Sequence, residues 1–201
     1  MILLRSFIFK YPKMNVVTYS SLCLSLFLVT SFFIHPSNAA AATTITTTTT
    51  IQPSNLVNKV CNQTSNYTFC VESLYANPKT PHANRQELAY IIFGSAYLNA
   101  TSTQEHIAKL LNKNANTSQR PLLLRCARDY TKAVSKLAVA YGDLDSETYN
   151  SLANYSRTAS AAADDCQAAF KGTHSPLTTR NKDLKGLCEI CVVVSKLFVT
   201  S

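Results

Sequence analysis

Residues 123–144 read LLRCARDYTKAVSKLAVAYGDL, and residues 149–170 read YNSLANYSRTASAAADDCQAAF. In both stretches apolar or small side chains recur at alternating intervals of three and four residues, which places them on one side of a helix. Neighbouring helices of a left-handed bundle pack together along such a stripe. We therefore predict two antiparallel helices joined by a turn that contains Gly142, Asp143 and Ser146. The repeated positions are Leu123, Cys126, Tyr130, Ala133, Leu137, Ala140 and Leu144, then Tyr149, Leu152, Ser156, Ala159, Ala163, Cys166 and Phe170.

Each stripe carries one cysteine, Cys126 in the first and Cys166 in the second. Their midpoint is residue 146, which lies in the predicted turn, so the two cysteines sit at the same height in an antiparallel pair. This placement allows the separation of about 5–6 Å between Cα atoms that a disulfide requires. We predict a Cys126–Cys166 bridge. The alternative, two buried free thiols, is disfavoured in an oxidising compartment.

The rest of the chain also has helical periodicity. Residues 54–60 and 67–75 are short enough for two small helices, and Asn84 with Glu87 forms a capping box before a long apolar face. A last helix begins at about Thr179. No run of period two is long enough for a sheet. The predicted fold is all-α, an up-and-down four-helix bundle preceded by a short helical hairpin. The face after residue 87 comprises Leu88, Ile91, Ile92, Ser95, Leu98, Ile107, Leu110 and Leu111, and the last helix has Leu184, Leu187, Cys191, Val194 and Phe198.

The hairpin contains two cysteines nine residues apart, Cys61 and Cys70, with a short polar loop between them. In a secreted chain this spacing is typical of a disulfide that closes a loop. Cys188 and Cys191 form a C-x-x-C pair, but they lie in the middle of a predicted helix, where no helix N-terminus activates a thiolate. No further cysteine pair or nearby histidine completes a zinc site. We interpret both as core residues.

The first part of the chain reads as a secretory leader. Arg5, Lys10 and Lys13 precede a mostly apolar stretch at 16–34, and small residues follow at 37–42. An uncleaved membrane anchor is the alternative, because the apolar stretch is just long enough to cross a bilayer. We expect a signal peptide over 1–42, a disordered Thr-rich segment over 43–53 and one folded domain over 54–201. N-glycosylation is predicted at Asn62, Asn66, Asn99, Asn116 and Asn154, which all stand in acceptor patterns.

Charge and motifs exclude several functions. After residue 42 the chain holds sixteen basic and eleven acidic side chains, a net charge of +5. This favours an acidic partner such as wall pectin or an acidic enzyme surface. The basic residues are scattered without interleaved aromatics, which argues against nucleic acid. The mature histidines are isolated, and the adjacent Asp164 and Asp165 point about 100° apart on a helix, so they cannot act as a glycosidase pair. We predict no enzyme activity, metal or cofactor.

The chain resembles the plant invertase/pectin methylesterase inhibitor family, and most of all its pollen-allergen branch, described as invertase inhibitors. The resemblance covers about residues 55–198. Its motifs are Val60-Cys61, Thr64, Phe69-Cys70 and Ser73-Leu74 with Pro78, then Cys126 with Tyr130 and Ala133, Tyr149 with Ala159, Ala163 and Cys166, Phe170-Lys171-Gly172, Ser175-Pro176 and Asn181-Lys182-Asp183-Leu184.

The resemblance implies a stand-alone protein inhibitor that acts in the apoplast, or alternatively in the vacuole. Its partner would be acid invertase or pectin methylesterase, whose active-site cleft it would occlude in a stoichiometric complex. Before it meets its target the mature protein would be a monomer with no membrane attachment. The competing interpretation is a secreted disulfide-bonded helical protein without inhibitory activity, such as a small-ligand carrier or an allergen-like protein.

The target remains open between the two enzymes. Characterised invertase inhibitors of this family carry a Pro-Lys-Phe motif in the turn after the Cys126-bearing helix, whereas residues 142–149 here read GDLDSETY. We nevertheless expect the target to contact this turn. The candidate contact residues are Asp143, Asp145, Glu147 and Tyr149.

Overall fold

The computed structural model describes residues 52–113 and 118–199. The predicted leader, nearly all of the Thr-rich segment and the sequon at Asn116 lie outside these residues. The elements are α1 (Asn55–Cys61), α2 (Tyr67–Tyr75), a short 3-10 helix η1 (Thr80–His82), α3 (Arg85–Lys113), α4 (Arg120–Asp145), α5 (Leu152–Ala169) and α6 (Thr178–Val199). The two described ranges contain helices and no strand, so the all-α prediction is confirmed.

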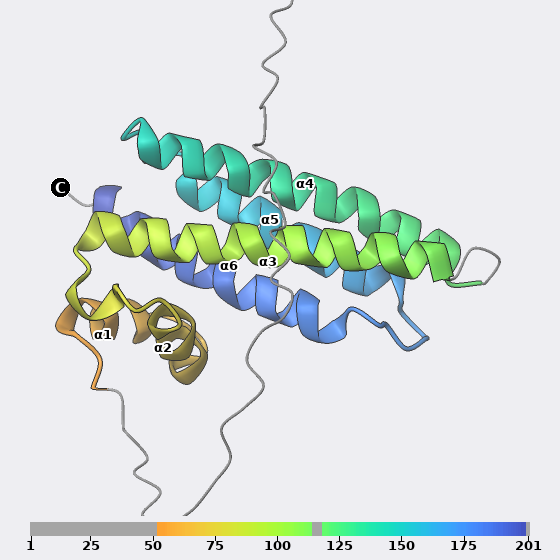
Figure 1. Cartoon of the computed structure of the whole chain (residues 1–201), viewed down its shortest axis with the longest axis horizontal. Helices are drawn as coiled ribbons and strands as arrows, with labels where there is room; N and C mark the ends of the chain where they lie inside the picture. The colour runs from red at the N-terminus through yellow and green to blue at the C-terminus, as the bar shows by residue number, and fades with distance from the viewer. Residues whose placement is uncertain (1–51, 114–117, 200–201) are drawn as a thin grey trace, which may run out of the picture. The chain divides into compact units, whose positions relative to one another are not determined.

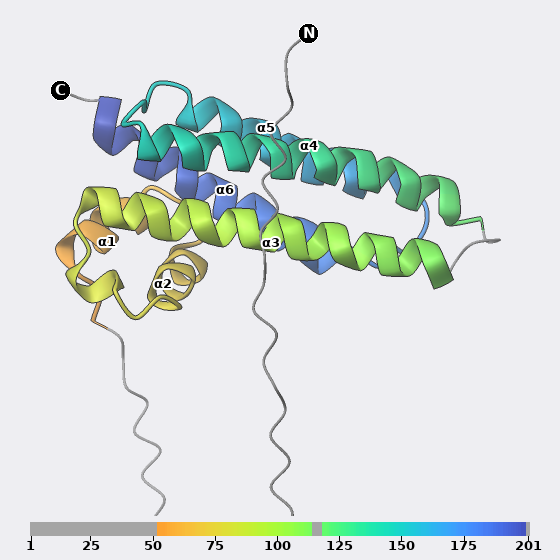
Figure 2. The same cartoon turned by 45° about the horizontal axis from the view of Figure 1, so that its top comes forward.

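The four long helices form an up-and-down bundle. In Figure 1 and Figure 2, α3 to α6 run side by side, and α1 and α2 lie against one end of the bundle. Each long helix packs against two others, because α4 neighbours α3 and α5, and α6 neighbours α5 and α3. The predicted order of a short hairpin followed by a four-helix bundle is confirmed.

The predicted capping box starts α3. The Glu87 backbone N–H donates to the Asn84 side-chain oxygen at 3.0 Å, and the Asn84 N–H donates to the Glu87 carboxylate at 2.9 Å. These two bonds satisfy donors that a helix start otherwise leaves without partners. Pro121 lies in the first turn of α4, where its missing N–H has no cost.

The stripe predicted for α4 is fully buried at all seven positions. On α3 the prediction was wrong for Leu98, which is 67% exposed. Leu88, Ile91, Ile92 and Ile107 of the predicted face are buried, and the face also contains Ala89, Ala96 and Ala100, which are fully buried and were not predicted. Small alanines bring the helix backbones close together, and a search for large apolar residues therefore overlooks them.

The turn after α4 begins later than predicted. Gly142 and Asp143 are helical, and α4 continues to Asp145, so the connection spans 146–151. The physical reason is Leu144, which is fully buried and is held by one further helical turn. The helix ends where Glu147 adopts a left-handed backbone with φ of 53°.

Both predicted cysteine pairs are disulfides in the structure. The Cα atoms of Cys61 and Cys70 are 5.5 Å apart, and those of Cys126 and Cys166 are 4.5 Å apart. The second bridge joins α4 to α5 at equal height, as the midpoint argument requires. Cys188 and Cys191 are free and buried in α6.

A buried polar chain links three helices inside the bundle. The Tyr130 hydroxyl of α4 donates to the Asn181 side-chain oxygen of α6 at 2.8 Å, and the Asn181 amide donates to Gln167 of α5, also at 2.8 Å. Tyr130 is fully buried and Asn181 is 2% exposed. Hydrogen bonding compensates these groups for the loss of water.

We expect Tyr130→Phe to lower the free energy of unfolding by about 1–3 kcal/mol, because it leaves the Asn181 oxygen buried without its donor. Tyr67→Phe is the matched control. It removes a hydroxyl that donates to Asn58 at 2.6 Å on the exposed surface, where water replaces the lost bond. Denaturant titration of both variants measures the difference, and equal losses would contradict the structural role of the buried chain.

Candidate functional site

The described residues show no catalytic arrangement. His82 lies in η1, His106 in α3 and His174 in the connection between α5 and α6. No group of three His, Cys, Asp or Glu side chains in these ranges could hold a metal ion. Within the same ranges, no helix has both the length and the apolar character to span a bilayer.

The turn between α4 and α5 has an unusual backbone. The Thr148 N–H donates to the Asp143 carbonyl at 2.8 Å, and the Glu147 N–H donates to the Leu144 carbonyl at 3.3 Å. This pair of bonds is a Schellman motif, whose left-handed position is usually glycine. Here the position is Glu147, which is exposed. A strained residue of this kind is often found at a functional site.

Replacing Glu147 tests this strain. We expect Glu147→Gly to be more stable than Glu147→Ala by about 1 kcal/mol, because both variants lose the carboxylate but only glycine accepts a positive φ without strain. Thermal unfolding of the two variants side by side measures this difference. If alanine were as stable as glycine, the left-handed turn would not exist in solution.

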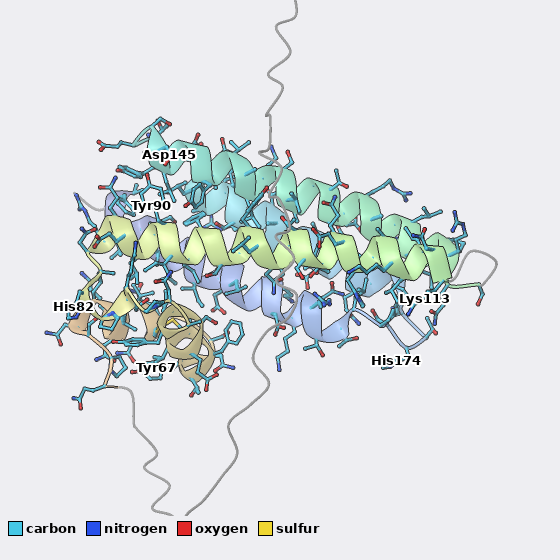
Figure 3. All side chains as sticks on the ribbon, viewed as in Figure 1. Tyr67, His82, Tyr90, Lys113, Asp145 and His174 are labelled. Carbon is cyan, nitrogen blue, oxygen red and sulfur yellow. A yellow bond between two sulfur atoms is a disulfide. The ribbon has the colours of Figure 1, made fainter. Side chains whose placement is uncertain are left out.

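Aromatic rings lie beside the acidic turn. The Tyr90 hydroxyl of α3 donates to the Asp145 carboxylate at 2.9 Å. The Tyr90 ring packs edge-on against the Tyr141 ring, with 5.5 Å between the ring centroids. Figure 3 shows Tyr90 and Asp145 at the same end of the bundle. The predicted contact residue Tyr149 is half-buried, and its ring stacks on the Phe198 ring of α6 with 4.2 Å between the ring centroids. Arg85 lies over the same Phe198 ring.

The four predicted contact residues therefore differ in their availability. Glu147 and Asp145 are exposed and Asp143 is half-buried, so their carboxylates are open to a partner at least in part. Tyr149 is held in the stack with Phe198, and its ring contributes one face at most. The structure thus places Asp143 and Asp145 in the last turn of α4, and Glu147 and Tyr149 in the connection that follows.

Sequence reasoning missed an adjoining apolar hollow. It lies between α3 and α4, has a volume of about 420 Å³ and is lined by Gly94, Tyr97, Leu98, Ala138 and Tyr141. Leu98 and Tyr141 are 67% and 38% exposed. Exposed aromatic and apolar side chains next to charged groups are typical of protein interfaces. The signal for this hollow in the sequence is Leu98, whose helical spacing places it on the predicted core face although it is exposed.

The contact with Asp145 also affects the ionisation of Tyr90. Partial burial raises the pKa of the Tyr90 phenol, and so do the hydrogen bond to Asp145 and the negative charge of that carboxylate. The raised value belongs to the folded state, so this contribution to stability is complete below about pH 10 and is lost as the pH rises through the pKa of the folded protein.

We expect Asp145→Asn to lower the pKa of Tyr90 but not to restore its ordinary value, because the burial remains. Absorbance titration of the phenolate, with Tyr90→Phe to identify the signal, measures the change. Asp143→Asn is the matched control, because Asp143 is absent from the groups that shift Tyr90. An unchanged Tyr90 titration in Asp145→Asn would mean that the two side chains do not meet in solution.

A larger hollow of about 990 Å³ lies between the hairpin loop, α5 and α6. The polar groups that line it bind mainly each other. Ser65 donates to Glu189 through its backbone N–H and its hydroxyl, at 2.8 and 2.7 Å, and Lys185 pairs with Asp164. The Phe69 ring also lies so close to Gly186 that a side chain at this position would collide with it. We interpret this hollow as the seam where the hairpin docks.

Comparison with known proteins gives one consistent result. The family model of "Plant invertase/pectin methylesterase inhibitor" matches residues 55–194. The chain is 32% identical to "Cell wall / vacuolar inhibitor of fructosidase 2" of Arabidopsis thaliana, over 71% of this chain and 81% of that protein. It is 36% identical to the "Putative invertase inhibitor" of Platanus orientalis, over 66% of this chain and 79% of that protein.

Pectinesterase inhibitors are similar too. The "Pectinesterase inhibitor" of Actinidia deliciosa is 29% identical over 89% of this chain and 94% of that protein. Among solved structures, a mutant form of a pectin methylesterase inhibitor from Arabidopsis superposes with a TM-score of 0.65 and 24% identity, covering 72% of this chain and 97% of that one. This structural likeness supports the fold.

Proposed function

Because the chain belongs to the plant invertase/pectin methylesterase inhibitor family, whose model matches residues 55–194, we propose that it inhibits acid invertase or pectin methylesterase. The inhibitor binds its target as a folded protein in a stoichiometric complex and occludes the active-site cleft. The family match carries this proposal. The relatives reported above are all named as inhibitors, so membership in the family favours an inhibitor over an enzyme.

The surface that we propose for the target comprises the acidic turn, with Asp143, Asp145 and Glu147, and the adjoining apolar hollow between α3 and α4. Charged residues steer the encounter and set its orientation, while buried aromatic contacts supply most of the affinity. A stable complex needs roughly 1,600 Å² of buried surface in total. The turn alone is too small for this area, and the neighbouring rings of Tyr90, Tyr97 and Tyr141 extend it.

The choice between the two enzymes stays open. The relatives include inhibitors named for fructosidase and for pectinesterase, and the turn lacks the Pro-Lys-Phe motif of characterised invertase inhibitors. We propose secretion to the cell wall, as the name of the Arabidopsis relative and the predicted leader suggest. N-glycosylation stays a prediction, although Asn62, Asn66 and Asn154 are exposed and thus compatible with attached glycans.

Complex formation tests the proposal. The full-length chain is expressed in a secretory host, and the purified product is mixed with acid invertase or with pectin methylesterase. Size-exclusion chromatography with light scattering should show a one-to-one complex with one of the two enzymes. Co-elution with neither enzyme would refute the proposed function.

A further inference from the structure

The charge of the bundle is concentrated at one end. The end of α3, the start of α4, the end of α5 and the start of α6 lie together, near the labelled Lys113 and His174 and opposite Tyr90 and Asp145 (Figure 3). Residues 105–113, 118–132 and 164–185, called here the basic half, hold ten Lys or Arg and five Asp or Glu. The remainder of 54–201 holds six of each. The basic half thus carries the entire net charge of +5.

Four of its exposed cations take no part in the ion pair that the described ranges contain. Lys109 and Lys113 are exposed on the last turns of α3, and Arg125 and Arg128 are exposed one turn apart near the start of α4. The ion pair found in the described ranges is between Lys185 and Asp164, and none of these four side chains takes part in it. Lys109 and Lys113 are therefore available to an anion from outside, whereas Arg125 and Arg128 also act on the nearby carboxylate of Asp129.

The surroundings of His106 reflect the same excess of positive charge. Burial lowers the pKa of this imidazole, and the charges of Arg180, Lys109 and Lys113 lower it further. No carboxylate contributes to this shift. Two helices, α3 and α6, thus direct cations to a common region.

The carboxylates of the basic half do not cancel this field. Asp164 is paired with Lys185. Asp129 and Asp165 lie near each other on α4 and α5, where burial and then the charge of Asp165 raise the pKa of Asp129, while Arg125, Arg128 and Lys132 lower it. The remaining two carboxylates are Glu105 and Asp183, and the exposed cations named above outnumber them.

The aromatic residues of the basic half are not available for stacking. Its Tyr and Phe residues are Tyr130 and Phe170, and both are buried, with 0% and 1% exposure. Single-stranded nucleic acids depend on exposed rings as well as on charge. Since such rings are missing here, the surface fits an anionic polymer that binds by charge, and a chain of sugar carboxylates has this chemistry.

We propose that the basic half binds a polyuronate, the carboxylate-bearing polysaccharide of the wall matrix. The choice of a wall polymer rests on the secretion suggested under the proposed function. Because the basic half lies at the opposite end from the acidic turn, the protein can hold the polymer and its target enzyme at the same time. The polymer would then retain the inhibitor where its target works.

Two charge-matched variants test the site. The basic-half triple is Lys109→Gln, Lys113→Gln and Arg125→Gln, and the control triple is Lys59→Gln, Lys79→Gln and Arg157→Gln. All six side chains are exposed, and each triple removes three positive charges, so the net charge of the two variants is equal. The full-length chain, purified from a secretory host, is titrated onto immobilised polygalacturonate, onto its fully methyl-esterified form and onto single-stranded DNA, with melting temperatures as a check of folding.

The basic-half triple should bind polygalacturonate about tenfold more weakly than the unmodified protein, and the control triple should stay within about twofold. Binding should vanish at about 0.5 M NaCl and with the esterified polymer, because the contacts are ionic. Equal losses in both triples, equal binding to the esterified polymer or to DNA, or no binding at low salt would overturn the proposal. Enzyme inhibition, assayed separately, should be unchanged in the basic-half triple, so failure of one proposal is distinguishable from failure of the other.

Discussion

Replacing Cys126 and Cys166 together by alanine is expected to lower the free energy of unfolding by about 4 kcal/mol, the largest loss we predict for stability. The bridge closes a loop with a sequence separation of 40 residues and lies at 0% exposure between α4 and α5. Its removal frees the unfolded chain and opens a gap in the seam of the bundle. For a domain of this size the melting temperature should fall by roughly 8–16 °C.

The second bridge is the matched control for the first. Cys61 and Cys70 close a loop of separation 9, so their double replacement by alanine should remove only about 2–3 kcal/mol. Thermal and urea unfolding of both variants under identical conditions give the comparison. If the hairpin variant lost as much stability as the bundle variant, or if peptide mapping paired Cys188 or Cys191 with any of the four, this assignment would be wrong.

Charge reversal at the turn between α4 and α5 is expected to have the largest effect on function. Asp143→Lys together with Glu147→Lys places two cations where the proposed contact surface has two carboxylates. Interface charges of this kind control the rate of association and the orientation of the partners. We expect the affinity for the target enzyme to fall by about tenfold or more, mainly through slower association.

A variant with the same change of charge elsewhere isolates the role of the turn. Glu72→Lys with Glu105→Lys alters two exposed carboxylates on α2 and α3 and changes the net charge equally. Its affinity, measured by surface plasmon resonance at the same ionic strength, should stay within about threefold of the unmodified protein. Equal losses in the two double variants would remove the turn from the interface.

Much of the bundle could be predicted because its signals are local. The stripes in α4 and α5 and the capping box at Asn84 are patterns within a few turns of one helix. The structure buries or bonds these residues as expected, except Tyr149, which precedes α5 and is half-buried. The height of Cys126 and Cys166 followed from their distance to the turn. Local spacing also identified α1 and α2 to within one residue or so at each end.

The details of the candidate site could not be predicted, because they depend on contacts distant in sequence. Tyr90 meets Asp145 across 55 residues, and Tyr149, in the connection between α4 and α5, stacks on Phe198 at the end of α6. The predicted end of α4 was too early because glycine often ends helices and Gly142 stands there. Burial of Leu144 extends the helix past Gly142. The left-handed Glu147 has no sequence signature, since glycine is the usual residue there.

The most direct measurement of the central claim is an inhibition titration. The purified protein is added in steps to a fixed amount of acid invertase with sucrose, and in parallel to pectin methylesterase with pectin. For one of the two enzymes, activity should fall in proportion to added protein and reach its minimum at one inhibitor per enzyme. The dissociation constant expected for a standard interface is far below about 10 µM. Full activity of both enzymes at about 10 µM of folded protein would therefore contradict the account.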